Sequence, residues 1–92
     1  MEYPKIVKTD GLTDLEIKVL EAARHTGYDD CFDTNATWCF AIAETAGISM
    51  SVFRGVASSL IKKGFAKIWD WEGKGKPMDM VFAYTEAGKL LF

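Results

Sequence analysis

The stretch from Cys39 to Ser58, CFAIAETAGISMSVFRGVAS, constrains the fold of this chain more than any other. Ala43 is small enough to let a second helix cross closely. Gly47, four residues later, can adopt the positive φ angle that a sharp turn after a helix requires. Ser49 then provides a favourable N-cap for a following helix. The stretch therefore predicts two helices joined by a tight turn.

The second of these helices has two chemically different faces. Apolar residues recur at helical spacing and predict a buried stripe made of Phe53, Val56, Ala57 and Leu60. The opposite face is small and polar, with Arg54 as an early cation, and it suits a helix that approaches base edges in the DNA major groove. The expected base-reading residues are Ser49, Met50, Ser51, Arg54, Gly55 and Ser58. An ordinary helical hairpin with Gly47 as its C-cap is the alternative interpretation.

An earlier helix is predicted by a capping signal. Thr13 and Glu16 have the Thr-x-x-Glu spacing of a capping box, in which each side chain accepts from the other residue's backbone N–H. Gly27 follows the apolar pattern and can end the helix. We therefore expect a helix over residues 13–26.

The two helices of the central stretch are expected over 37–46 and 49–63. The segment before them is acidic and contains turn-forming residues. Asn35 or Thr37 can cap the first of the two helices, and we expect Trp38 to lie in the core.

The apolar pattern changes from helical to alternating after residue 64. The segments FAKIWDW and MDMVFAY predict two strands, and the turn EGKGKP between them predicts a β-hairpin over 65–84. Thr85 is a favourable N-cap for a short closing helix, whose last three residues are expected to return to the core. Lysines at the end of the preceding helix and at the hairpin tip are the expected phosphate contacts: Lys62, Lys63, Lys74 and Lys76.

This order of elements predicts an α+β fold, with a three-helix core, a C-terminal hairpin and a short closing helix. It resembles the winged helix-turn-helix domains of MarR-like and PadR-like bacterial transcription regulators, over roughly residues 12–92. The matching motifs are Ile42-Ala43 through Gly47-Ile48-Ser49, Leu60 through Gly64, and Tyr84 through Gly88. The resemblance implies a small regulator of bacterial or phage origin that binds double-stranded DNA sequence-specifically. It also implies that the hairpin is the wing.

Charge is distributed unevenly along the chain. The net charge is −2 and the pI is 5.3, which argues against nonspecific coating of nucleic acids. Residues 1–46 carry nine acidic against four basic side chains, whereas residues 47–92 carry four acidic against seven basic ones. The basic half contains the expected reading helix, and this modest asymmetry supports a surface that meets phosphates.

Length and composition limit the remaining classes of protein to which the chain could belong. At 92 residues and 49% apolar side chains, we expect one domain spanning 1–92. No apolar run is long enough to cross a membrane and no signal peptide is visible, so a cytoplasmic location is expected. Cys31 and Cys39 are expected to be free thiols, and with His25 they lack zinc-ligand spacing. We expect no metal, no cofactor and no enzymatic activity, since no nucleophile has a base partner.

A second function class remains open from the sequence. The hairpin has more aromatic and sulfur side chains than one face can bury, and the loop 29–33 is acidic. A protein partner could bind through this loop or through Trp69 and Trp71, as in an anti-repressor or an assembly subunit built on a winged helix.

MarR-like regulators dimerise through additional helices, for which 92 residues leave no room. A monomer or weak homodimer is therefore expected.

Overall fold

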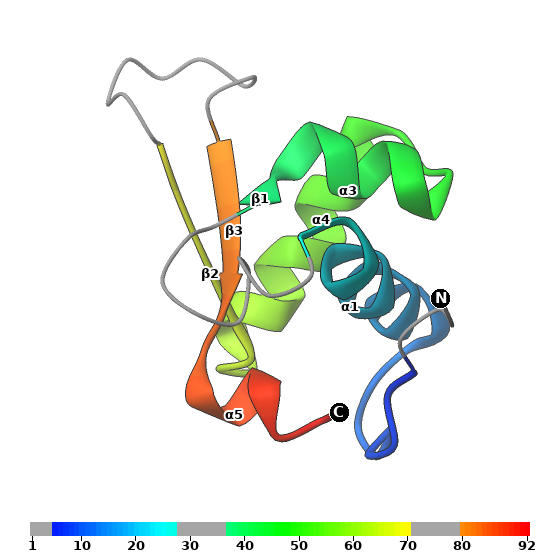
Figure 1. Cartoon of the computed structure of the whole chain (residues 1–92), viewed down its shortest axis with the longest axis vertical. Coiled ribbons are helices and arrows are strands. Elements are labelled where there is room, and N and C mark those ends of the chain that lie inside the picture. The colour runs from blue at the N-terminus through cyan, green and yellow to red at the C-terminus, as the bar shows by residue number, and fades with distance from the viewer. Residues whose placement is uncertain (1–4, 28–36, 71–79) are drawn as a thin grey trace.

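Three helices, a small antiparallel sheet and a short closing helix make up the described part of the chain. The computed structural model describes residues 5–27, 37–70 and 80–92. Its elements in chain order are α1 (Asp14–Gly27), β1 (Thr37–Trp38), α3 (Cys39–Ala46), α4 (Met50–Lys62), β2 (Ala66–Asp70), β3 (Met80–Tyr84) and α5 (Glu86–Lys89). Figure 1 shows α1, α3 and α4 packed together beside the sheet. The predicted α+β class and the winged helix-turn-helix order are confirmed.

α1 begins at the predicted capping box. The Thr13 backbone N–H donates to Oε1 of Glu16 at 2.8 Å, and the Glu16 N–H donates to Thr13 Oγ1 at 3.1 Å. These bonds satisfy two backbone donors that the first helical turn leaves without a partner. The helix buries an apolar face made of Val19, Leu20, Ala22 and Ala23.

The sheet contains the predicted hairpin and one strand that was not predicted. Its strand order is β1-β3-β2, with both neighbouring pairs antiparallel. In the hairpin, Ala66 pairs with Tyr84 and Trp69 pairs with Val81. β1 pairs with the other edge of β3, so β3 is the central strand.

The start of the second helix was predicted wrongly. The expected helix over 37–46 begins at Cys39, because Thr37 and Trp38 form β1 instead. Strand alternation buries Thr37 and turns Trp38 outward, and Trp38 is 39% exposed where the core was expected. Trp38 also occupies the N-cap position without a side-chain cap, so Thr37 does not cap this helix, and Asn35 lies outside the described residues.

A row of aromatic rings connects the helices to the sheet and the C-terminus. Phe53 of α4 lies 6.4 Å from Phe82 of β3 between ring centroids, and Phe82 lies 5.5 Å from Tyr84. Tyr84 in turn makes an edge contact with Phe92 at 5.5 Å. The Tyr84 hydroxyl donates to the carbonyl of Leu20 in α1. Phe82 and Tyr84 are therefore part of the core.

The closing helix α5 forms where predicted. Thr85 Oγ1 accepts the N–H of Gly88 at 3.2 Å. A side chain at Gly88 would place its Cβ 2.0 Å from the Phe65 carbonyl oxygen, so this close approach requires glycine. Leu91 is buried, but Leu90 is 68% exposed. The expectation that all three final residues return to the core was therefore wrong for Leu90, because the helical turn points it away.

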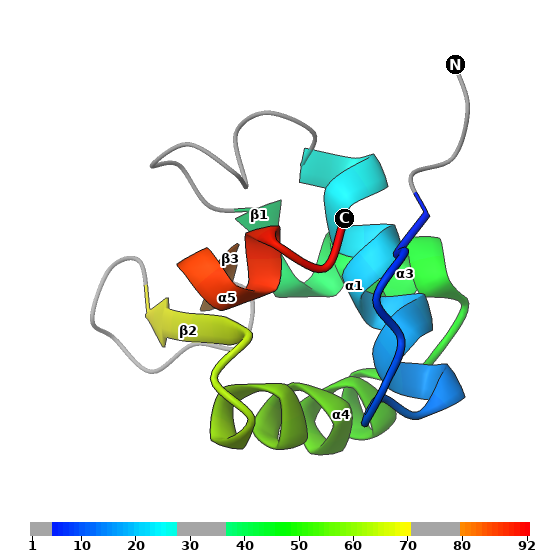
Figure 2. The same ribbon diagram turned by 90° about the horizontal axis from the view of Figure 1, so that it is seen from below.

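The first described residues pack beside the C-terminus. Ile6 is buried and its N–H donates to Glu21 Oε2 at 2.9 Å. The Val7 N–H donates to the Leu91 carbonyl at 2.9 Å. Figure 2 shows this segment running along α1 toward α4, which lies along an outer edge of the molecule. α4 is therefore held on its inner side and open on its outer side.

Candidate nucleic-acid interface

The predicted turn joins α3 to α4. Gly47 adopts φ 72° in the left-handed region, which glycine reaches without strain. Its N–H donates to the Glu44 carbonyl at 3.1 Å, and the Ile48 N–H donates to the Ala43 carbonyl at 3.0 Å. The chain turns by 107° between the two helices. This angle lies within the roughly 90–120° of helix-turn-helix motifs.

α4 begins at the predicted N-cap and buries the predicted stripe. Ser49 Oγ accepts the Val52 N–H at 3.2 Å. The residues that face the core are Phe53, Ala57 and Leu60, with Val56 partly buried beside them. The side chains on the other side of the helix are consequently turned toward solvent.

The predicted base-reading residues share this outer side, with one exception. The exposed ones are Ser49, Ser51, Arg54, Gly55 and Ser58, and Lys62 is exposed with them. Met50 is only half exposed because it packs against the core. Within the described ranges, the structure records no hydrogen bond or ion pair for the Arg54 guanidinium or the Lys62 ammonium. Both cations are therefore available to an anionic partner.

Lys63, predicted to contact phosphate, is partly exposed, but its ammonium is held by contacts within the fold. Its Nζ donates to Oε1 of Glu16 at 2.7 Å and to the Gly11 carbonyl at 2.7 Å. Ser59 Oγ, which the sequence did not single out, donates to Oε2 of Glu16 at 2.7 Å. This network fixes the C-terminal half of α4 against the start of α1.

The buried carboxylate of Glu16 is the electrostatic centre of that network. Burial by itself raises the pKa of Glu16, but the hydrogen bonds from Lys63, the Thr13 backbone and Ser59, with the charge of Lys63, outweigh burial and lower the pKa to about 2. Glu16 is only 1% exposed, so it is an ionised group inside the protein. Its ion pair with Lys63 is part of the fold.

Several predicted residues fall outside the described part of the chain: Lys74, Lys76, Trp71 and the acidic segment 29–33. Trp69 is half-buried, and Lys67 Nζ lies 5.9 Å from its ring centroid. Lys67 is an exposed cation on the hairpin that was not among the predicted contacts.

Cys39 is a buried free thiol, as predicted. Burial raises its pKa to about 12, which keeps the thiol protonated and unreactive. Among the described residues, no group of three or more His, Cys, Asp or Glu side chains could hold a metal ion. None of the described helices is by itself long and apolar enough to cross a membrane.

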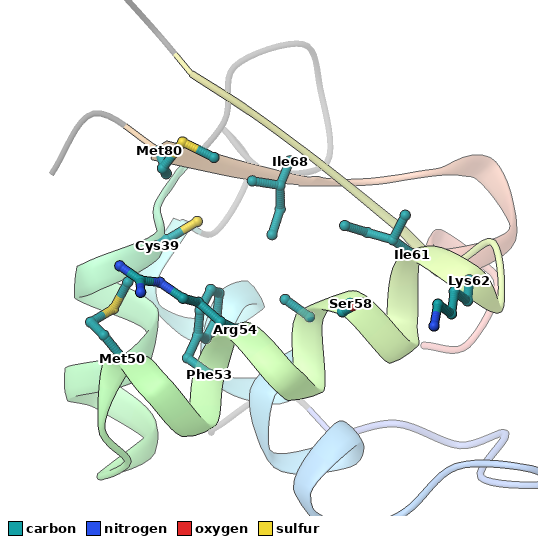
Figure 3. A pocket seen from close by; sticks show the side chains of 10 residues that line it. Cys39, Met50, Phe53, Arg54, Ser58, Ile61, Lys62, Ile68 and Met80 are labelled. Atoms are coloured by element: carbon teal, nitrogen blue, oxygen red, sulfur yellow. The ribbon is translucent and has the colours of Figure 1, made fainter. Parts of the chain in front are cut away.

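A groove between α4 and the hairpin strands was missed from the sequence. Figure 3 shows side chains of α4 facing those of β2 and β3 across an open space, with Arg54 beside Met50 and Cys39 at one end. The cavity volume is about 490 Å³. We call this cavity the α4–hairpin groove, and its main side chains are Met50, Arg54, Ile61, Lys62, Ile68 and Met80. The hairpin contributes Ile68 and Met80 to it, whereas only Trp69 and Trp71 of the hairpin were considered from the sequence as protein-binding residues.

The fold resembles that of a solved bacterial protein. The chain superposes on the crystal structure of a candidate DNA-binding protein from Ralstonia eutropha JMP134 with a TM-score of 0.69 and 26% sequence identity. The match covers 88% of this chain and 93% of that one. No protein-family model and no curated protein sequence matches the chain. The likeness supports the winged helix-turn-helix fold, whereas the MarR-like and PadR-like resemblance stays a prediction.

Proposed function

We propose that this chain binds double-stranded DNA sequence-specifically and regulates transcription in the cytoplasm, as a small bacterial or phage regulator. The observation that carries the proposal is the outer face of α4. There Ser51, Arg54 and Ser58 are exposed on a helix whose other face is buried. Helix-turn-helix proteins place such a helix in the major groove. The similarity to the candidate DNA-binding protein of R. eutropha supports the same function.

The outer face of α4 has the chemistry needed to read base pairs. A guanidinium can donate two hydrogen bonds to O6 and N7 of guanine, and we assign this role to Arg54. The hydroxyls of Ser51 and Ser58 can donate or accept. Gly55 presents no side chain, and a Cβ there would meet nothing within 4 Å, so a base pair can approach the helix backbone closely.

Other predicted residues contribute less to the reading face. Ser49 Oγ already accepts the Val52 N–H, and Met50 is partly packed against the core. We propose phosphate contacts from Lys62, Lys74 and Lys76. The Lys63 ammonium is held by Glu16 and Gly11, so Lys63 acts first in positioning α4, and a phosphate contact from it stays a prediction.

Selection of duplexes from a random pool, followed by binding measurements with variants, tests the proposal. Arg54→Ala should weaken binding to the selected site by about 1–3 kcal/mol and change little on random duplexes. Lys62→Ala should weaken both kinds of duplex alike, because a phosphate contact carries no sequence information. Lys18→Ala is the matched control, since Lys18 is an exposed lysine on α1.

Failure to enrich any sequence would contradict sequence-specific binding, and an equal loss for Arg54→Ala on selected and random duplexes would contradict its role. A wild-type chain that binds no duplex at low salt would favour the second candidate, a winged-helix module that binds protein. The observation that favours that candidate is Trp38, which is 39% exposed and stacks on Phe40 with 6.4 Å between the ring centroids.

A further inference from the structure

DNA binding does not explain the apolar walls of the α4–hairpin groove. A phosphate backbone that passed over the groove would gain nothing from Met50, Ile68 or Met80. Ile61, which lines the groove, remains 44% exposed. The volume of about 490 Å³ lies within the roughly 300–1,000 Å³ of small-molecule sites. The groove therefore fits a partner that is largely apolar.

The charges at the groove point to an anion. Both charged side chains that line it, Arg54 and Lys62, are cationic. In the described part of the chain neither of them makes a hydrogen bond or ion pair. A guanidinium pairs with a carboxylate through two parallel hydrogen bonds, which a point charge cannot do. Arg54 is therefore the better anchor for a carboxylate.

The groove is elongated along α4. Figure 3 shows Arg54 and Met50 at one end and Ile61 and Lys62 at the other. With a rise of about 1.5 Å per residue, the wall from Met50 to Ile61 is about 16 Å long. A linear chain can follow this wall, and the flexible side chains of Met50 and Met80 can adapt to it.

We propose that the α4–hairpin groove binds a linear aliphatic carboxylate, with the carboxylate on Arg54 and the chain between Ile61 and Ile68. A consequence for regulation rests on the proposed function. If Arg54 reads guanine, the same guanidinium cannot pair with the carboxylate at the same time. The ligand and DNA then compete for Arg54, and the ligand releases the DNA.

Octanoate is a suitable probe because its neutral counterpart, 1-octanol, has the same chain length. In protein carrying ¹³C-labelled methionine and isoleucine methyl groups, octanoate should shift the signals of Met50, Met80, Ile61 and Ile68. Ile6 and Ile17 do not line the groove and serve as internal controls. Octanol and butyrate should each bind at least about tenfold more weakly, since octanol lacks the carboxylate and butyrate lacks most of the apolar chain.

Arg54→Gln should weaken octanoate binding at least about tenfold, because it removes the charge-assisted pair. Arg54 is exposed, so this variant should keep the native methyl spectrum. Lys18→Gln on α1 is the matched control and should bind octanoate like the wild type. Equal binding of octanol and octanoate, or shifts that spread to Ile6 and Ile17, would overturn the proposal.

Adding octanoate to the complex with a selected duplex separates this proposal from the proposed function. Release of the DNA by octanoate, but not by butyrate, supports the competition at Arg54. If octanoate shifts the methyl signals of the groove while the protein–DNA complex persists, the proposed competition for Arg54 is wrong. If no duplex binds at all, the proposed function fails, while the methyl shifts still decide whether the groove takes a carboxylate.

Discussion

The two flanks of α4 are built differently. On the flank that faces α1, Ser59 and Lys63 donate to the buried carboxylate of Glu16. On the flank that faces the hairpin, apolar side chains line an open groove, and Arg54 and Lys62 have no recorded partner among the described residues. The first flank positions the helix, and the second is available to a partner.

Lys62 and Lys63 are adjacent in the sequence, yet one lies on the binding flank of α4 and the other on the flank that positions the helix. Successive residues of a helix point about 100° apart, because a turn takes 3.6 residues. Lys63 therefore reaches Glu16 on α1, whereas Lys62 lies at the edge of the groove. Residue type alone does not distinguish a structural cation from a binding one here.

The largest expected effect is a difference in the free energy of unfolding between alanine variants of these two lysines. Lys63→Ala leaves the carboxylate of Glu16 buried without its cation. It should lower the free energy of unfolding by about 3 kcal/mol, the lower end of the range for a broken buried ion pair, because Lys63 is partly exposed. Lys62→Ala should change it by less than about 0.5 kcal/mol. Urea unfolding followed by circular dichroism measures both. Equal losses would show that the two flanks do not differ in the way described.

The ionisation of Glu16 gives a pH test of the same flank. Its folded-state pKa, about 2, lies below the ordinary 4.5, so ionised Glu16 stabilises the fold above about pH 4.5, and this stabilisation is lost as the pH falls toward 2. About 2 kcal/mol should be lost by about pH 3.

The pH test uses substituted chains as references. The stability difference between the wild type and Glu16→Gln should shrink between about pH 6 and about pH 3 by this amount. Glu86→Gln is the matched control, because Glu86 also pairs with a lysine but its side chain is 92% exposed. A difference from Glu16→Gln that stays constant over this range would refute the assigned pKa.

The smallest expected effect concerns two serines at the start of α4. Ser49→Ala removes the N-cap of α4, whose hydroxyl accepts the Val52 N–H, and should lower the free energy of unfolding by about 1 kcal/mol. Ser51→Ala lies on the exposed face and should leave stability unchanged or slightly higher, since alanine favours helix. Thermal unfolding of both variants checks this. A loss for Ser51→Ala as large as that for Ser49→Ala would mean that the outer face also holds the fold together.

Local signals in the sequence predicted most of the fold. The capping box of Thr13 and Glu16, the left-handed turn at Gly47, the cap at Ser49 and the hairpin each depend on residues close together in the chain. Their hydrogen bonds follow from residue type and spacing, so they could be identified without coordinates.

Long-range partners could not be predicted in this way. β1 exists because Thr37 pairs with Phe82, and Lys63 is structural because it reaches Glu16, which lies 47 residues earlier. The sequence around Thr37 or Lys63 does not indicate which distant residue each one contacts. The α4–hairpin groove was missed for the same reason, because its lining residues come from α3, α4, β2 and β3, which are brought together only by the fold.

The most direct test of the central claim is an NMR titration of the ¹⁵N-labelled protein with a random duplex of about twenty base pairs, at low and at moderate salt. We expect amide shifts confined to the start and outer face of α4 and to the hairpin, and we expect them to shrink as salt rises. No shifts at low salt, or shifts centred on α1, would contradict the assignment of α4 as the DNA-binding helix.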